Sequence, residues 1–192
     1  ATILVRRMGV LRGHCRSSGK RHHVVTRPTV PHDHRPVEDP PQVGRRLQCN
    51  TVAMDLDSAL AWAADRHHAV LITLRRDGRA QSSDVVYAVR DGVVRISVTD
   101  DRAKTRNLVR DPRAVVHITD PDSWSYLSLD GTVELSPVAA TPGDAVCEEL
   151  AELLRDVQGR EHPDWAEFHR AMIDDQRRVV RFTPTAATGQ VR

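Results

Sequence analysis

The sequence predicts a mainly β fold, a small antiparallel barrel with peripheral helices, and three observations support it. Short runs rich in valine, isoleucine and leucine follow one another in hairpin and meander order. Two Asp-Gly dipeptides, Asp77-Gly78 and Asp91-Gly92, stand between such runs, as expected for tight turns. Strands and helices do not alternate throughout, as a doubly wound sheet would require. With aromatic residues at 4 %, we expect a core of mostly Val, Leu, Ala and Ile.

Six segments have the composition and the apolar spacing of strands. Each ends near a turn signal or a proline, which fixes its approximate limits. Gly131 lies inside the fifth segment, where a glycine predicts a bulge or a close approach of another backbone. The predicted strands are residues 69–74, 81–89, 93–99, 114–119, 124–135 and 178–184.

Four other segments have helical periodicity. The first repeats apolar residues at helical spacing and has acidic residues in its first turn. The second, from about Arg102 to Arg110, ends where Asp111-Pro112 follows, because proline disfavours helical backbone in the residue before it. The third contains an acidic face of Glu148, Glu149 and Glu152 that we expect to be solvent-exposed. The predicted helices are residues 55–66, 102–110, 142–156 and 163–175.

Charge and composition divide the chain near residue 53. Residues 1–53 contain ten basic and three acidic side chains (+7), whereas residues 54–192 contain eighteen and twenty-three (−5). The first part holds five of the eleven prolines and no sustained hydrophobic period, so it is predicted to be a disordered or upstream extension. Residues 54–192 are predicted to form one folded domain, and we expect the native protein to begin near Met54.

Composition also excludes several classes of function. A mildly acidic body argues against nucleic-acid binding, and no apolar run approaches the roughly 18 residues that a membrane span needs. The three cysteines share no disulfide or metal-type spacing, which suits a reducing cytoplasm. No nucleophile elbow and no ligand-type histidine spacing is present, so the sequence predicts no catalytic side chain and no metal site.

Lys104 is the best candidate for a ligand-binding residue. It is the only lysine in residues 54–192, where the other seventeen basic residues are arginine. It stands at the start of a predicted helix, whose unpaired N–H groups attract anions. Arg102, Thr105 and Asn107 add a cation and two hydrogen-bonding groups within about one turn. This set predicts a phosphate site, which suits a phosphorylated cofactor.

The same residues carry a family resemblance. A strand, an Arg-Asp-Gly turn, the run at residues 81–87, a second hairpin and the run at residues 102–113 resemble the pyridoxamine 5′-phosphate oxidase-like flavin-binding proteins. Within that group the chain looks most like the actinobacterial enzymes that use the deazaflavin coenzyme F420. The resemblance covers about residues 56–185. Its most specific part is Arg-x-Lys-Thr-x-Asn-Leu followed by Asp-Pro-Arg.

The resemblance implies a split β-barrel of the antiparallel Greek-key, FMN-binding type. It also implies a homodimer with cofactor sites at the subunit interface. The tricyclic ring is implied to contact main-chain atoms of Gln81, Ser82, Ser83, Asp84, Val85 and Val86, and the ribityl chain is implied to contact Ser97, Val98 and Thr99. The phosphate and tail are implied to contact Arg102, Lys104, Thr105 and Asn107. The cleft is implied to be lined by Trp124 and Tyr126, from the same or the partner subunit.

Asp84 departs from the family pattern, in which a neutral amide or a small polar residue is expected. A carboxylate beside an anionic reduced deazaflavin is unfavourable by Coulomb repulsion. Asp84 therefore either points away from the ring or changes the contact with it.

The implied function is reduction of an unsaturated small molecule by hydride from the C5 atom of reduced F420. An FMN-dependent oxidase or reductase of the same fold is the alternative, because both cofactors carry a ribityl phosphate. Arg102 and Arg106 favour F420, since its anionic tail continues past that phosphate. A non-catalytic cofactor- or haem-binding protein is a further alternative, although His117 in mid-strand is a poor axial ligand.

Overall fold

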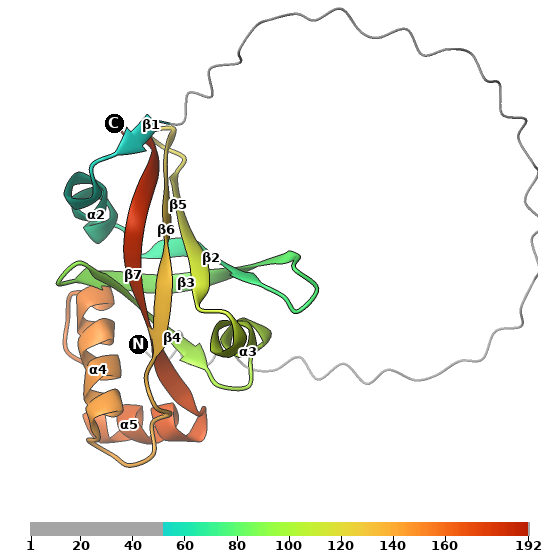
Figure 1. The fold of residues 1–192 in the computed structure, drawn as a ribbon. Coiled ribbons are helices and arrows are strands. Elements are labelled where there is room, and N and C mark those ends of the chain that lie inside the picture. Colours follow the sequence, from blue (N-terminus) through green and yellow to red (C-terminus); the bar gives the residue numbers. More distant parts are fainter. Residues whose placement is uncertain (1–51, 192) are drawn as a thin grey trace, which may run out of the picture. The chain divides into compact units, whose positions relative to one another are not determined.

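The computed structural model describes residues 52–191, which form a β-barrel with helices at its periphery (Figure 1). The predicted extension, residues 1–53, lies outside the described residues except for its last two positions. The elements are β1 (Val52–Met54), α2 (Leu56–Ala64), β2 (His68–Leu74), β3 (Ala80–Arg90), β4 (Val93–Thr99), α3 (Ala103–Arg110), β5 (Arg113–Asp120), β6 (Ser125–Leu135), α4 (Ala145–Gln158), α5 (Trp165–Asp174) and β7 (Arg177–Gln190).

All strand pairs are antiparallel, and the sheet closes on itself. The strand order is β1-β7-β4-β3-β2-β5-β6, and β7 also pairs with β6. Six strands therefore form a barrel, to which β1 adds at the end of β7. Closure gives each of these six strands a partner on both sides along at least part of its length. The predicted mainly β, antiparallel split-barrel class is confirmed.

Strand β7 joins the two ends of the barrel. Its first part pairs with β4, its last part pairs with β1, and its other edge follows β6 from Leu135 to Tyr126. The register shifts between Asp130 and Gly131, so the bulge predicted at Gly131 is confirmed. A Cβ atom on Gly131 would lie 2.2 Å from the Thr183 carbonyl oxygen, so no other residue fits without backbone movement.

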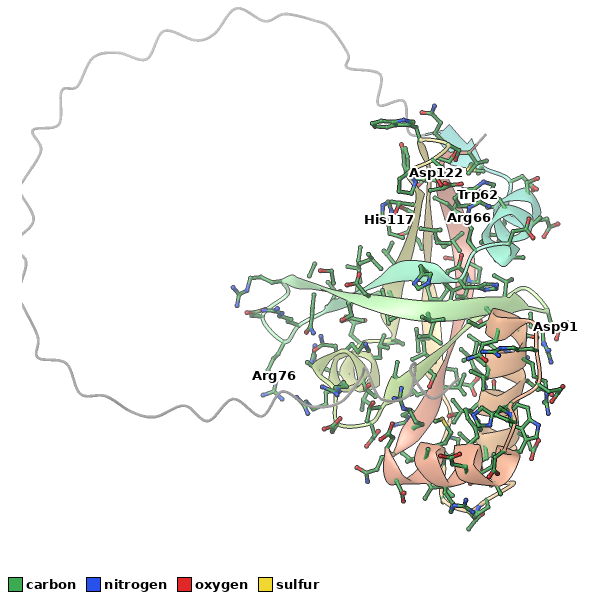
Figure 2. All side chains as sticks on the ribbon, turned by 180° about the vertical axis from the view of Figure 1, so that it is seen from behind. Trp62, Arg66, Arg76, Asp91, His117 and Asp122 are labelled. Atoms are coloured by element: carbon green, nitrogen blue, oxygen red, sulfur yellow. The ribbon has the colours of Figure 1, made fainter. Side chains whose placement is uncertain are left out.

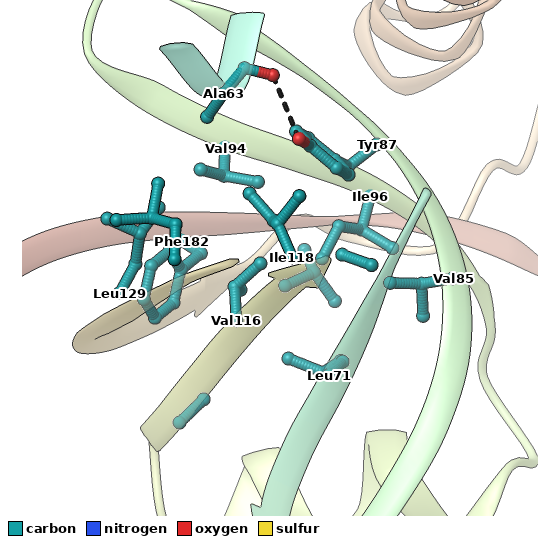
Figure 3. Close-up of a cluster of buried hydrophobic side chains, with 14 of the residues drawn as sticks. Ala63, Leu71, Val85, Tyr87, Val94, Ile96, Val116, Ile118, Leu129 and Phe182 are labelled. Atoms are coloured by element: carbon teal, nitrogen blue, oxygen red, sulfur yellow. Dashed lines mark hydrogen bonds between the residues drawn. The ribbon is translucent and has the colours of Figure 1, made fainter. Parts of the chain in front are cut away.

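The barrel interior is filled by aliphatic side chains and two aromatic rings (Figure 3). The Tyr87 hydroxyl donates a hydrogen bond of 2.8 Å to the Ala63 carbonyl oxygen and so fixes α2 against the barrel. Burial raises the pKa of Tyr87 above its ordinary value, which keeps this donor protonated. The predicted Val, Leu, Ala and Ile core is confirmed, with Tyr87 and Phe182 as its largest members.

The acidic face of α4 was predicted to face solvent, and that prediction is wrong for Glu149, whereas the Glu152 side chain is partly exposed and also forms ion pairs. Positions 149, 152 and 156 share one helix face, and this face lies against arginines of β3, β4 and β7. The ion pairs are Arg181–Glu149 (2.7 Å), Arg95–Glu152 (3.3 Å), Arg90–Glu152 (2.9 Å) and Arg90–Asp156 (2.6 Å). These pairs, with a second apolar cluster that α4 and α5 share, attach both helices to the outside of β4 and β7.

Candidate functional site

The barrel is split between β3 and β4. Their ladder joins only residues 87–90 of β3 to residues 93–96 of β4. The preceding part of β3 pairs with β2 alone, and Ser97–Thr99 of β4 pair with β7 alone. In the part of the chain that the structure describes, no strand pairs with the two facing edges. The two main-chain segments implied by the resemblance, Gln81–Val86 and Ser97–Thr99, are these free edges.

The direction of the main-chain groups follows from Tyr87. Its N–H donates to the His67 carbonyl oxygen at 3.0 Å, and its own carbonyl oxygen lies 3.2 Å from His67 Nδ1, so both groups face β2. Main-chain groups alternate between the two sides of a strand. Those of Ser82, Asp84 and Val86 therefore face the split. Such unpaired N–H and C=O groups can bind a flat ligand that has hydrogen-bonding edges.

Helix α3 lies at the mouth of the split and is fixed by two side chains. The Thr105 hydroxyl donates to the Thr99 carbonyl oxygen at 2.8 Å. The Asn107 amide donates to Thr73 Oγ1 and to Gln81 Oε1, both at 3.1 Å. Thr105 and Asn107 are buried, and these donors are used inside the protein. Both residues thus position α3 between β2, β3 and the end of β4.

The start of α3 has features of an anion site. The other helices in residues 52–191 each have an aspartate N-cap whose side chain accepts a main-chain hydrogen bond, whereas the N-cap of α3, Arg102, makes none. The first N–H groups of α3 are therefore not capped by a side chain, and they carry partial positive charge.

Lys104 is half-buried and makes no hydrogen bond or ion pair with another residue of the described chain. Burial lowers the pKa of its ammonium below the ordinary value, and the neighbouring Arg102 and Arg177 guanidinium groups lower it further. The Asp84 carboxylate acts in the opposite direction. A desolvated cation among other cations is stabilised when an anion binds beside it.

Arg177 is a residue of this cluster that the sequence did not single out. It stands at the start of β7 opposite Thr99 and pairs with Asp175 at 3.0 Å. Its charge still reaches Lys104. The only signal in the sequence was the Arg177-Arg178 pair at the start of a strand, and such pairs are common on protein surfaces.

Trp124 and Tyr126 lie at the other end of the barrel. Arg177, near Lys104, begins β7, whereas Gln190, opposite Tyr126, ends this strand of 14 residues. At about 3.3 Å per residue, the two ends are up to roughly 40 Å apart. Figure 2 places Asp122, in the turn before Trp124, far from the helix α3. One copy of the chain therefore does not bring Trp124 and Tyr126 to Lys104.

Trp124 itself has an unusual conformation. Its φ angle is 53°, and 83 % of its surface is exposed. A bulky residue with positive φ is rare and costs conformational energy. The turn thus presents a large ring to its surroundings.

Two further features are absent from residues 52–191, a cluster of metal-binding side chains and a membrane-spanning helix. No group of three or more His, Cys, Asp or Glu residues there could hold a metal ion. No helix in this range is both long and apolar enough to cross a membrane.

Comparisons with known proteins agree with the fold. Residues 57–190 match the family described as pyridoxamine 5′-phosphate oxidase. A conserved hypothetical protein from Mycobacterium tuberculosis is similar at 20 % identity, over 73 % of this chain and 86 % of that chain, with a TM-score of 0.58. A pyridoxamine 5′-phosphate oxidase-related, FMN-binding protein from Nostoc punctiforme is similar at 16 % identity, over 70 % and 82 %, with a TM-score of 0.52.

An F420 reductase also matches, at 24 % identity over 63 % of this chain and 88 % of that chain, with a TM-score of 0.49. The likenesses to the Mycobacterium tuberculosis and Nostoc punctiforme proteins show a shared fold.

Proposed function

This chain belongs to the pyridoxamine 5′-phosphate oxidase family, and on that premise we propose that it is a coenzyme F420-dependent reductase of an unsaturated small molecule. The observation that carries the proposal is Lys104, a half-buried ammonium without a partner in the described chain, beside two free strand edges. Together these offer a cation for a phosphate and main-chain groups for a ring.

Each part of the split has a role in this proposal. The main chain of Ser82, Asp84 and Val86 binds the edge of the ring, and Ser97 and Thr99 face the ribityl chain. Ser83, Val85 and Val98 hold the two edges in place, and the buried side chains of the two valines pack in the core. Arg102 and Lys104 bind the phosphate. Gln81 acts indirectly, because its side-chain oxygen accepts the hydrogen bond that fixes Asn107.

When bound, the deazaflavin supplies the hydride, and the protein supplies binding, orientation and electrostatics. The residues of the split contain no matched pair of acid and base, so the proton is expected to come from solvent or from a residue of the partner. Arg102 and Arg106 are both exposed beside the proposed phosphate position. They favour F420 over FMN, because F420 has an anionic tail after the phosphate.

The site requires a second copy of the chain in this proposal. Helices α4 and α5 cover the side of β4 and β7, whereas the outer face of β2 and β5 carries half-buried Val70, Ile72, Leu74 and Val115. A two-fold dimer through this face buries these apolar side chains. It also allows Trp124 and Tyr126 of one copy to approach Lys104 of the other, which explains why they lie far apart in a single chain.

An FMN-dependent oxidase or reductase is the second candidate, because Lys104 binds a ribityl phosphate equally well in either cofactor. The purified protein is to be titrated with F420 and with FMN separately, following the quenching of ligand fluorescence. Micromolar binding of F420 without binding of FMN is expected. The reverse result contradicts the F420 proposal and supports the FMN candidate, and binding of neither contradicts both.

A further inference from the structure

Asp84 lies on the free edge of β3 within the split. Its side chain is exposed, and the main-chain groups that it contributes face the split. The β3–β4 register pairs Tyr87 with Ile96. Continued by three residues along both strands, this register sets Asp84 opposite Thr99, the residue that accepts the Thr105 hydrogen bond at the start of α3. The exposed carboxylate thus lies at the free edge of β3, close enough for its charge to reach Lys104.

Among the described acidic residues around Lys104, Asp84 has no ion-pair partner. Asp101 lies 3.7 Å from Arg102, Asp175 lies 3.0 Å from Arg177, and Asp100 lies 2.7 Å from Arg178. Asp84 makes no ion pair of this kind with a described residue, although its charge reaches Lys104. Its field therefore acts on whatever charge the split receives.

Reduction changes the charge of a flavin or deazaflavin. Hydride uptake adds two electrons and one proton to the ring, so the bound cofactor gains one negative charge unless a second proton follows. The carboxylate of Asp84 repels this additional charge, whereas Lys104 attracts the phosphate in both redox states. The two residues thus act on different parts of the cofactor.

We propose that Asp84 is a specificity-determining residue that weakens binding of the reduced cofactor relative to the oxidised one and so makes the bound reduced cofactor a stronger hydride donor. This inference rests on the proposed function, because it requires a flavin-type ring in the split. In this inference Asp84 sets the redox preference of the site through its charge, which also reaches Lys104.

The test compares wild-type protein with Asp84→Asn, which removes the charge and keeps the size. Dissociation constants for oxidised and reduced F420, and for oxidised and reduced FMN, are to be measured at pH 8 under anaerobic conditions. Asp84→Asn is expected to tighten binding of the reduced form by about three- to tenfold relative to the oxidised form. The midpoint potential of the bound cofactor then rises by about 14 to 30 mV, since tenfold corresponds to about 30 mV for two electrons.

Two variants control for structural effects. Asp91→Asn makes the same substitution on the same strand hairpin, about 23 Å along the chain from Asp84, and asparagine before Gly92 preserves the turn. Asp91→Asn is expected to leave unchanged the ratio between the dissociation constants of the reduced and the oxidised cofactor. Asp84→Glu keeps the charge and is expected to retain most of the wild-type ratio. The effect of Asp84→Asn should also shrink in 1 M salt, because an exposed charge is screened.

The outcomes separate this inference from the proposed function. If wild-type protein binds neither cofactor, the proposed function fails and the inference fails with it. If wild-type protein binds a cofactor but Asp84→Asn leaves the ratio and the midpoint potential unchanged, the inference alone is overturned. An equal change in Asp91→Asn also overturns it, because the effect then does not come from the split.

Discussion

Replacing Lys104 with alanine is expected to weaken binding of the phosphate-bearing cofactor by roughly 1.5–3 kcal/mol, the usual range for a hydrogen bond to a charged group. The loss corresponds to more than a tenfold rise in the dissociation constant. The physical reason is the position of Lys104, half-buried beside the uncapped start of α3. Titration of F420 or FMN into the purified variant measures the effect.

The same variant has a second expected signature, in stability. Because the pKa of Lys104 is lowered in the folded protein, the folded state holds this proton less tightly than the unfolded chain does. The protonated side chain therefore destabilises the fold at neutral pH, and Lys104→Ala is expected to keep or raise the melting temperature. Arg170→Ala, which removes an exposed cation of α5, is the matched control and should leave affinity unchanged. Unchanged affinity in Lys104→Ala would refute the phosphate role.

Replacing Glu149 with alanine is expected to lower the free energy of unfolding by about 3 kcal/mol, the lower end of the range for one partner of a buried ion pair. Arg181 binds both Glu149 oxygens, at 3.0 and 2.7 Å, and Arg95 lies 3.8 Å from the same carboxylate. The Glu149 carboxylate holds the pKa of Arg181 above its ordinary value. The lower end applies because Arg181 is about one-third exposed.

Glu148 provides the control, because it precedes Glu149 on the same helix and is exposed. Its carboxylate lies 3.8 Å from Nε2 of His169. Glu148→Ala is expected to change the free energy of unfolding by no more than about 0.5 kcal/mol. Chemical denaturation of both variants measures the difference, and equal losses would show that the arginine contacts of α4 do not stabilise the fold.

Features with a local cause were predictable from the sequence. The bounds of β4 are those predicted, and β2 differs by one residue, because apolar runs and Asp-Gly turns depend on neighbouring residues. Asp91 and Gly92 both have positive φ, at 53° and 75°, as the Asp-Gly signal of a two-residue hairpin requires. Gly131 was predictable for the same reason, since a glycine within a strand has few other uses.

Features that depend on distant partners were not predictable. Strand β7 continues past Pro184 to Gln190, although it contains Ala186, Ala187 and Gly189, because β6 and β1 pair with it there. Strand β1 begins two residues before the predicted domain start and has no signal of its own. Glu149 was predicted to be exposed because the helix sequence does not reveal Arg181, 32 residues later.

The candidate site shows the same division. Composition indicated Lys104 as a candidate, and the predicted helix start indicated Arg102, Thr105 and Asn107, which lie within about one turn of it. The free edge of β3 contains the polar run Gln81–Asp84, but such a run does not reveal which side of the strand lacks a partner. Only the strand register shows that Ser82, Asp84 and Val86 lack partners on one side.

The most direct test of the phosphate site compares cofactors with and without their phosphate. Wild-type protein and Lys104→Ala are to be titrated with FMN and riboflavin, and with F420 and its deazaflavin precursor that lacks the phosphate. If Lys104 binds the phosphate, the variant loses roughly 1.5–3 kcal/mol for the phosphorylated ligand and little for its counterpart. An equal loss for both members of a pair would contradict the phosphate site, because Lys104 would then act on the ring or on the fold.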